Sequence, residues 1–406
     1  MVVNSNLKKF LQSPLTLVWL CTFMDVIGIS ILSPFLPQFI LEYGATLTQT
    51  GWVLSANACI AFFSSIIWGS LSDKYGRKPT LFICRLGSVA GYLLLAFAPN
   101  IYVLILARLL DGIFARGILI SLTVVGDWVP PEERSAEMSK IGLAWILGNL
   151  LGPAIGALLV GFGLTALGLC CAGLSMAALL ITQFTLKESN VHRAARQGDG
   201  KRKPVFSFGL LKEYTPRALL AQSQFMSLAH FIFSMTVSLF MLIRFNMDNV
   251  QIGLLLTLIG CLNLLVRLFV FPLVMVRLRD ERALMAGLWM FLAGFLSLMF
   301  LNKLWQYALV YILVSFATTI SIDLMNGIMS LKVEPGRLGE MIGLNSAVEN
   351  ISLILGPVIG SSLLGVADPR LYGASSLVFT LVALVIGRRF LGFSALPKKE
   401  ESVRPD

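Results

Sequence analysis

Charged residues are scarce in this 406-residue sequence, at 13%, whereas hydrophobic residues make up 56%. An ordinary soluble domain carries about 25% charged residues, which it needs to cover its surface. The composition therefore excludes a soluble globule and indicates a protein embedded in a lipid bilayer.

Catalytic and metal-binding signatures are also lacking. The sequence contains no HExxH, GxSxG or Cys/His cluster. The longest segment predicted outside the membrane, residues 187–213, is too short for a soluble catalytic domain. The 6 cysteines all lie in apolar runs, where we interpret them as small hydrophobic residues. We expect no enzyme activity, no metal and no cofactor.

Apolar runs of about twenty residues, the length that a helix needs to cross a bilayer, recur along the whole chain. Breaks at Pro, Gly, Asn and charge clusters divide them into predicted helices. The twelve helices span roughly residues 15–41, 50–72, 79–98, 101–127, 136–161, 164–186, 216–244, 250–275, 282–301, 305–330, 339–366 and 370–390. The predicted fold class is an all-α membrane protein with twelve transmembrane helices in two pseudo-symmetric six-helix bundles.

Basic residues are concentrated in the loops on one side of these helices, and the other side carries only Arg244, Lys303 and Arg370. The positive-inside bias makes the basic loops cytoplasmic, so both termini are expected in the cytoplasm. The net charge of +10 therefore encodes orientation and does not indicate nucleic-acid binding. We expect a multi-pass protein of the plasma (inner) membrane, monomeric in the simplest case.

The basic segment 187–213 is interpreted as a cytoplasmic linker between an N-terminal half, residues 1–186, and a C-terminal half, residues 214–406. A repeated residue order supports two duplicated halves. The first block contains Arg134, Glu137, Met138, Gly148, Gly152, Pro153 and Gly156. About 203 residues later the second block contains Arg337, Glu340, Met341, Gly356, Pro357 and Gly360. Parallel halves predict a binding site near the bilayer midplane at their interface. Two independent packing kinks are the alternative.

The loop after the second predicted helix has a distinctive spacing of glycine and charge, carried by Gly69, Asp73, Gly76, Arg77 and Lys78. We expect Gly69 to permit close helix approach and Gly76 to permit a tight turn. Asp73 and Arg77 are expected to form charge contacts in one state of the protein and release them in another. An ordinary basic cytoplasmic loop is the alternative.

Several charged residues lie inside predicted membrane helices, where each costs roughly 2.5 to 3.5 kcal/mol unless it faces a cavity or a partner. Asp25 and Arg116 lie at about one depth and are predicted to face each other. Arg267 and Asp323 form a second candidate pair on the same argument. Each pair serves either proton coupling and substrate contact or helix register alone.

Further candidates for the proton path or the substrate cavity lie near the middle of other helices. Arg108 and Asp111 are three residues apart, a spacing that permits a side-chain contact. Glu349 follows Asn345 by four residues and has no cation on its own helix, so it is a candidate proton site. His230 titrates in a useful range, although a lone histidine is more often a packing residue. The cavity walls are also expected to include Asn57, Asn149, Phe231 and Asn263.

The loop motif resembles the signature loop of the major facilitator superfamily. Asp127, followed by Pro130, Glu133 and Arg134, resembles the companion loop of that superfamily, which implies an ion pair between Asp127 and Arg77. In the second half the equivalent of the signature loop is degraded and keeps only Arg277, Arg279 and Asp280.

Three more segments resemble the twelve-helix drug:proton antiporters, including tetracycline efflux proteins: residues 25–28 with Pro34 and Pro37, residues 108–112, and residues 152–156. The resemblance implies that Arg108 belongs to the proton path and that the Gly-Pro run is the antiporter motif, whose glycines allow close helix packing. The sequence departs from the pattern at Asp111, Arg116 and Ala157.

These features predict a secondary transporter that works by alternating access and exports amphipathic small molecules or drugs in exchange for protons. An organic-anion or metabolite carrier that uses Arg116, Arg108 or Arg267 as its anion site is the alternative. A receptor or scaffold without transport is disfavoured, because such a protein does not need so many polar groups in the membrane.

Overall fold

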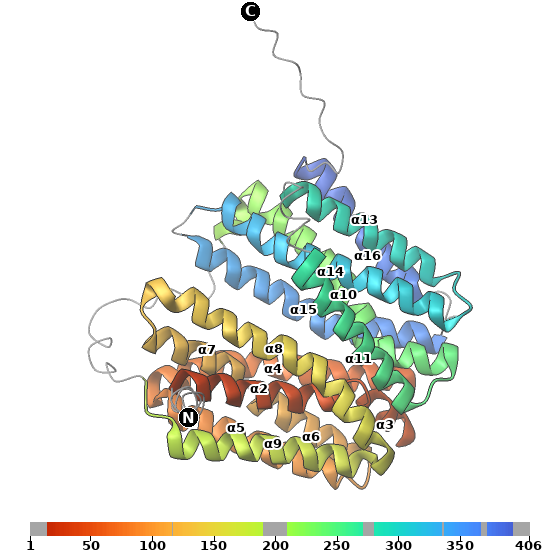
Figure 1. Cartoon of the computed structure of the whole chain (residues 1–406). Helices are drawn as coiled ribbons and strands as arrows, with labels where there is room; N and C mark the ends of the chain where they lie inside the picture. The colour runs from red at the N-terminus through yellow and green to blue at the C-terminus, as the bar shows by residue number, and fades with distance from the viewer. Residues whose placement is uncertain are drawn as a thin grey trace, which may run out of the picture. The chain divides into compact units, whose positions relative to one another are not determined.

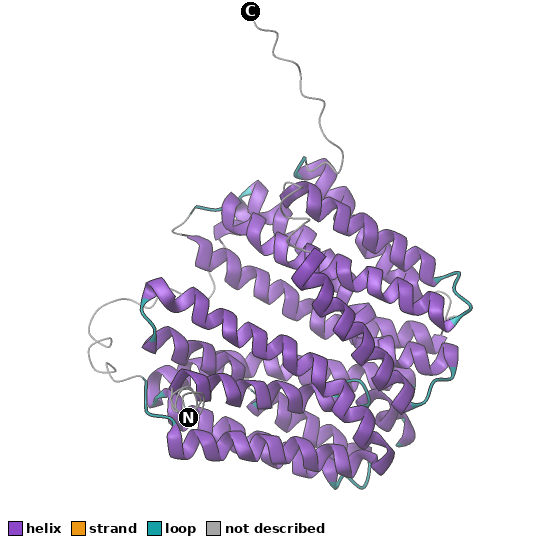
Figure 2. Cartoon of the chain, in the orientation of Figure 1, coloured by secondary structure: helices purple, strands orange, loops and turns teal. Residues whose placement is uncertain are grey.

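The computed structural model describes residues 14–115, 117–189, 209–270, 280–334, 337–366 and 372–392. These residues form helices joined by short turns, and none of them lies in a strand (Figure 2). The chain divides into two compact units, residues 1–202 with 238–260 and residues 203–237 with 261–406. The predicted all-α membrane fold is confirmed.

In the first unit α2 packs on both α8 and α9, α5 packs on α9 and α6, and α4 packs on α6 (Figure 1). Apolar residues at the end of α2 and the turn after it, including Ile31, Leu32 and Phe35, are fully buried in its core. The elements are α2 (Pro14–Leu32), α3 (Leu36–Glu42), α4 (Leu47–Tyr75), α5 (Arg77–Ala96), α6 (Ile101–Phe114), α7 (Gly117–Trp128), α8 (Pro131–Leu159), η1 (Val160–Phe162) and α9 (Gly163–Thr185).

In the second unit α13 packs on α14 and on α16. The boundary between the units falls inside α10 and α11, so each unit holds part of both helices. The elements after the linker are η3 (Gly209–Lys212), α10 (Tyr214–Phe245), α11 (Asn249–Leu265), η4 (Val266–Val270), α13 (Asp280–Leu298), α14 (Leu304–Lys332), α15 (Leu338–Val366), α16 (Tyr372–Val385) and η7 (Ile386–Phe390), of which η4 and η7 are π-helical.

Among the described residues, 10 helical stretches are long and apolar enough to cross a membrane. Two local features explain the difference from the twelve predicted helices. The stretch Ala136–Thr185, with 50 residues, merges the fifth and sixth predicted helices into one. The fourth predicted helix, residues 101–127, is divided into α6 and α7, with 14 and 12 residues, and each piece alone is too short to be counted.

The division of the fourth helix is abrupt. α6 ends at Phe114, Ala115 leaves the helical conformation with ψ 58°, and α7 begins at Gly117. The first predicted helix, residues 15–41, is also divided, into α2 and α3, beside Pro34 and Pro37. Prolines explain that second division because they remove backbone donors.

Side chains of α4 take over the carbonyl groups that the end of α6 leaves without helical partners. The Ser64 hydroxyl donates to the Gly112 carbonyl at 2.8 Å, and the Trp68 indole N–H donates to the Ile113 carbonyl at 2.7 Å. The break between α6 and α7 is therefore stabilised by the packing of α4 on α6.

Candidate functional site

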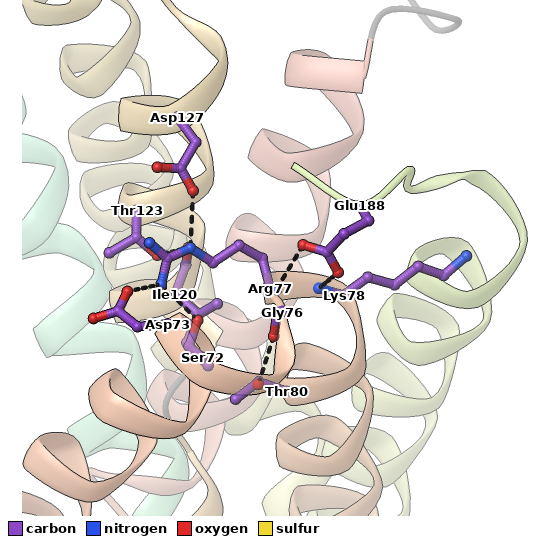
Figure 3. A network of polar contacts seen from close by, with 10 residues as sticks. All are labelled: Ser72, Asp73, Gly76, Arg77, Lys78, Thr80, Ile120, Thr123, Asp127 and Glu188. Carbon is purple, nitrogen blue, oxygen red and sulfur yellow. Dashed lines mark hydrogen bonds and ion pairs between the residues drawn. The ribbon is translucent and has the colours of Figure 1, made fainter. Parts of the chain in front are cut away.

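Arg77, the first residue of α5, is the centre of a network of polar contacts (Figure 3). Its Nη1 donates to Asp73 Oδ1 at 2.7 Å and to Ser72 Oγ at 2.9 Å, and its Nε donates to Asp127 Oδ2 at 2.9 Å. One guanidinium thus ties the end of α4 and the end of α7 to the start of α5. The predicted ion pair between Arg77 and Asp127 is present.

The two carboxylates that contact the Arg77 side chain differ in exposure and therefore in their contribution to stability. The Asp73 side chain is 55% exposed, whereas the Asp127 side chain is 14% exposed and the Arg77 side chain 7%. An exposed ion pair contributes about 0 to 1 kcal/mol, but removing one partner of a buried pair costs roughly 3 to 5 kcal/mol. Asp127 is therefore the main partner of Arg77.

Glu188, in the chain that follows α9, completes the network from a different side (Figure 3). Its Oε1 accepts the backbone N–H of Arg77 at 2.8 Å and its Oε2 accepts that of Lys78 at 3.1 Å. A carboxylate in this place satisfies two unpaired donors of α5 and interacts favourably with the positive end of the helix dipole. Analysis of the sequence missed Glu188, because only the fold reveals which carboxylate reaches the start of α5.

Gly76 is the C-cap of α4 and the N-cap of α5, with φ 109°. This backbone conformation favours glycine, and a Cβ atom at Gly76 would also lie 2.6 Å from Glu188 Oε2. The predicted tight turn is therefore present, and it also makes room for the Glu188 carboxylate. Gly69 differs from its prediction, since no described atom lies within 4 Å of a Cβ built there. The expected close helix approach at Gly69 is not found among the described residues.

Arg134 lies in the first turn of α8, and its Nη2 donates to the Val129 carbonyl, in the turn before this helix, at 3.3 Å. Its equivalent in the repeat, Arg337, instead pairs with Glu213 and with Glu340 Oε2, the latter at 3.3 Å. The hydrogen bonds from Arg337 to Glu213 and Glu340 raise the pKa of the Arg337 guanidinium above its usual value. Because the pKa is raised, the stabilisation from the contacts of Arg337 with Glu213 and Glu340 is fully present below the ordinary pKa of arginine. It is lost only when the pH rises through the raised pKa. Arg277 and Arg279 lie outside the described residues.

Asp25, in the middle of α2, pairs with Arg85 of α5. Arg85 donates to Asp25 Oδ2 through Nη2 at 3.0 Å and through Nε at 3.3 Å, and its Nη1 contacts the Thr182 hydroxyl of α9. The predicted partner, Arg116, lies outside the described residues. Arg85 was missed, although an arginine inside a predicted membrane helix is itself a signal for a buried partner.

Arg108 and Asp111 form the contact that their spacing predicts, with Nη1 and Oδ2 2.8 Å apart. Asn57 of α4 donates to the Arg108 carbonyl at 2.7 Å and lies 3.4 Å from Asp111 Oδ2. Among the described residues, Asp111 Oδ1 and Arg108 Nε are buried without a hydrogen-bond partner. An unpaired buried polar atom costs roughly 1 to 3 kcal/mol. This pair therefore has capacity for a further ligand, water or proton.

In the second unit Arg267 of η4 and Asp323 of α14 form the second predicted pair, at 2.8 Å. Their side chains are 43% and 35% exposed, so this pair is more accessible than those of the first unit. Half-exposed ion pairs contribute little to stability. The Arg267 guanidinium is therefore only partly covered by the described residues.

Glu349 belongs to a polar cluster centred on Asn345 of α15. The Asn345 amide donates to Glu349 Oε1 at 2.9 Å and to Asn326 Oδ1 at 3.0 Å, and it accepts the Ser223 hydroxyl at 2.6 Å. The cluster joins α10, α14 and α15 in the second unit. Sequence analysis identified Glu349 and Asn345 by their spacing but missed Asn326 and Ser223, which come from other helices.

His230 of α10 lies 3.4 Å from the Thr318 hydroxyl and against the ring of Phe231. These neighbours match the interpretation of His230 as a packing residue, and its functional role remains a prediction. Of the other expected cavity residues, Asn149 accepts a hydrogen bond from Ser30 at 2.9 Å, and Asn263 Oδ1 is buried without a partner among the described residues.

The glycines of the first repeat block lie where α8 meets α2. A Cβ atom at Gly148 would lie 3.2 Å from the Ile27 nitrogen, and one at Gly152 would lie 2.7 Å from the Ser30 carbonyl carbon. At Gly156 it would lie 2.6 Å from the Ile31 carbonyl oxygen. Pro153 lies inside α8 among these contacts.

The second block repeats this packing on a different helix. A Cβ atom at Gly356 would lie 2.8 Å from the Phe231 carbonyl carbon, and one at Gly360 would lie 3.0 Å from the Ile232 carbonyl oxygen. Pro357 lies inside α15. Both blocks therefore place glycines at backbone-to-backbone contacts, α8 on α2 and α15 on α10, as expected for duplicated halves.

Comparison with known proteins finds a family model described as Major Facilitator Superfamily, which matches residues 18–316 and 225–406. The tetracycline resistance protein of class C from Escherichia coli is 26% identical over 372 residues, which are 90% of this chain and 91% of that protein. The multi-drug resistance efflux pump PmrA of Streptococcus pneumoniae is 33% identical over 179 residues, 43% of this chain and 45% of that protein. The crystal structure of the human organic anion transporter MFSD10 (TETRAN) superimposes with a TM-score of 0.67 at 20% identity, covering 92% of this chain and 98% of that one.

Proposed function

This chain belongs to the Major Facilitator Superfamily, and from that premise we propose that it exports amphipathic small molecules in exchange for protons. It is an integral multi-pass membrane transporter. The finer proposal is that its two halves, residues 1–186 and 214–406, rock about a central substrate path to give alternating access. Both termini lie in the cytoplasm in this proposal, and the protein works as a monomer in the plasma (inner) membrane.

The observation that carries the proposal is the Arg77 network. Arg77 contacts Asp73 and Asp127 through its side chain and Glu188 through its backbone N–H. In the proposed orientation, which is supported by the basic residues around it, the network lies on the cytoplasmic side. A cluster of ionic contacts that joins α4, α5, α7 and the chain after α9 suits a latch that stabilises one state and is released in another.

Coupling to protons is assigned to carboxylates inside the membrane. Asp25 and Asp111 are each held by an arginine, and Glu349 by Asn345. A carboxylate of this kind becomes neutral when it binds a proton, so its partner is then free to move or to bind something else. The same group thereby links proton uptake to a change in helix contacts. The homologous tetracycline resistance protein and the efflux pump PmrA support a drug-like substrate.

A second candidate function is transport of an organic anion or metabolite. The observation that favours it is the exposure of the Arg267 side chain, 43%, which leaves its donors accessible beside Asp323. A guanidinium binds a carboxylate or phosphate through two parallel hydrogen bonds. Arg108 and Arg116 are further candidates for the anion site.

Proton release from the purified protein tests the two functions against each other. A panel of cationic drugs and organic anions is added in weak buffer, with Asp25→Asn and Arg116→Ala alongside. The export proposal expects release on adding cationic drugs and its loss in Asp25→Asn. A response to organic anions alone, lost in Arg116→Ala, supports the anion carrier and contradicts drug export.

A further inference from the structure

A small cavity lies beside Asp25 and Arg85 in the first unit, and its walls come from α2, α5, α9 and the junction of α6 and α7. Its volume is about 20 Å³. A cavity needs roughly 10 to 15 Å³ to hold one water molecule, whereas pockets for drug-sized ligands measure about 300 to 1,000 Å³. This cavity therefore has room for one water and excludes a drug. Its polar lining consists of Asp25, Arg85, Ser88, Tyr92 and Ser175.

Asp25 has one carboxylate oxygen that accepts no hydrogen bond from a described residue. Arg85 directs both of its hydrogen bonds with Asp25 to Oδ2, which leaves Oδ1 without such a donor. The guanidinium is held independently, because its Nη1 contacts Thr182, whose hydroxyl donates to the Ala178 carbonyl at 2.7 Å. Arg85 is thus fixed by α9 even when Asp25 changes its charge.

The break in the fourth helix brings a helix end to the same carboxylate. A Cβ atom at Gly117, the first residue of α7, would collide with Asp25 Oδ2 and lie 3.8 Å from Arg85 Nη2. The first turn of a helix carries partial positive charge. The guanidinium and the start of α7 therefore both attract the Asp25 carboxylate, and a proton competes with them for it.

The other end of α7 carries Asp127, the main partner of Arg77. Over its 12 residues α7 is about 18 Å long, at 1.5 Å per residue. A helix of this length moves as a rigid element, so a shift at Gly117 is transmitted to Asp127. The fourth membrane helix thus connects the Asp25 pair to the Arg77 network.

We propose that the break between α6 and α7 creates a one-water proton site at Asp25, and that α7 couples this site to the Arg77 network. The inference rests on the proposed proton-coupled function and adds its location and its mechanical link. A hydronium ion gives its proton to Asp25 Oδ1 and leaves as water, and an O–H bond forms on the carboxyl group. The neutral carboxyl no longer attracts the start of α7, which moves and loosens the contact between Asp127 and Arg77. Arg85 is a positioning residue in this step.

Other titratable or charged groups surround Asp25 and have to be separated from it in any measurement. The titratable residues of α7 and α8 lie at the far ends of those helices, at Asp127 and between residues 132 and 140. The groups close to Asp25 or to its neighbours are Cys21 on α2, Cys84 and Tyr92 on α5, Arg108 and Asp111 on α6, and Cys171 on α9.

Infrared difference spectroscopy of the full-length protein, titrated with acid in the absence of drug, tests the site directly. We expect the protonated-carboxyl signal of the wild type to contain a band that is lost in Asp25→Asn, while the bands of other carboxyl groups, such as Asp111 and Glu349, persist. In Arg85→Gln the same signal is expected at a proton concentration about tenfold lower, because a positive partner is removed. Gly117→Ala is expected to shift it in the same direction. Gly126→Ala is the matched control on α7, since its new Cβ meets only Met138 Cε at 3.8 Å.

Hydrogen exchange at constant pH tests the link to the network. Asp25→Asn imitates the protonated carboxyl, so the amides of Arg77, Lys78 and Thr80 are expected to exchange several-fold faster than in the wild type. The proposal is overturned if no carboxyl band is lost in Asp25→Asn, if Gly117→Ala behaves like Gly126→Ala, or if exchange at the amides of Arg77, Lys78 and Thr80 is unchanged. Should Asp25→Asn not fold, the Gly117 and Gly126 variants decide. Failure of drug-driven proton release with an intact carboxyl signal would instead contradict the proposed function.

Discussion

At the scale of single residues, the first unit uses arginines as junctions between helices. Arg77 joins α4, α5 and α7, and Arg85 joins α2, α5 and α9. The Arg77 side chain is 7% exposed and the Arg85 side chain 3%. A buried arginine is costly unless its donors are satisfied. Each carboxylate around these residues is therefore a point at which the helix arrangement can be changed by a single charge.

Replacing Glu188 with glutamine tests its part in the Arg77 network. Glutamine keeps the size but offers one acceptor oxygen for two backbone donors and no charge at the start of α5. We expect a loss of about 1 kcal/mol in the stability of the contact, which is a fivefold change or so in the population of the latched state. The measurement is hydrogen exchange at the amides of Arg77, Lys78 and Thr80, together with transport. Glu334→Gln, on the exposed segment after α14, is the control and should behave as the wild type.

Gly76→Ala is expected to be damaging for two reasons. Its φ of 109° strains any residue with a Cβ, and the new atom would displace the Glu188 carboxylate. We expect a clear fall in melting temperature, from strain of roughly 1 to 3 kcal/mol, and a loss of transport. In Gly69→Ala no described atom lies within 4 Å of the new Cβ, so this variant should preserve the melting temperature. Equal melting temperatures for the two variants would contradict the part assigned to Gly76.

At the scale of helices, the sequence predicted most elements to within a few residues but not the interruptions that shape the site. Residues 101–127 contain no proline, and the break after Phe114 depends on Ser64 and Trp68 of another helix. The position of those donors is a tertiary property, which local pattern does not encode. Arg108 and Asp111 were predictable because they share one helix face. Arg85 and Glu188 were missed because their partners come from helices distant in sequence.

The packing of α8 on α2 gives a prediction at this scale. In Gly152→Ala the new Cβ would press on the backbone of Ser30, so we expect a destabilisation of about 1 to 3 kcal/mol. Gly142→Ala lies on the same helix, has no described atom within 4 Å of its new Cβ and should be neutral or slightly stabilising. Thermal unfolding in detergent compares the two. A melting temperature for Gly152→Ala equal to that of the Gly142 variant would show that the contact tolerates a methyl group.

At the scale of the whole molecule, composition and loop charge predicted more of the fold than any single residue did. The membrane fold and the family followed from apolar run lengths and from the loop around Arg77. Substrate identity did not, because the polar residues expected in the substrate cavity are distributed over many helices and their partners depend on packing. The internal repeat was visible in sequence and reappears as equivalent glycine contacts in α8 and α15.

Orientation in the membrane gives the prediction at this scale. Because the basic loops are expected in the cytoplasm, a reporter active only in the cytoplasm should be active when fused after residue 406. The same reporter placed between α10 and α11, at residues 246 to 248, should be inactive. A periplasmic reporter at both positions provides the reciprocal control. The opposite pattern would invert the direction of transport proposed here.

The carboxylate contacts at Glu188 and at Glu340 also bear on protein engineering. Glu188 fastens the chain to the start of α5, and Glu340 Oε1 accepts the backbone N–H of Leu210 at 3.1 Å, which fastens it again near the start of α10. An insertion between residues 190 and 208 leaves both of these contacts in place. This segment is therefore the position for inserting a rigid fiducial protein for electron microscopy. An insertion only a few residues earlier, between Leu186 and Glu188, would pull on the cap of α5 and disturb the state that the microscope is meant to record.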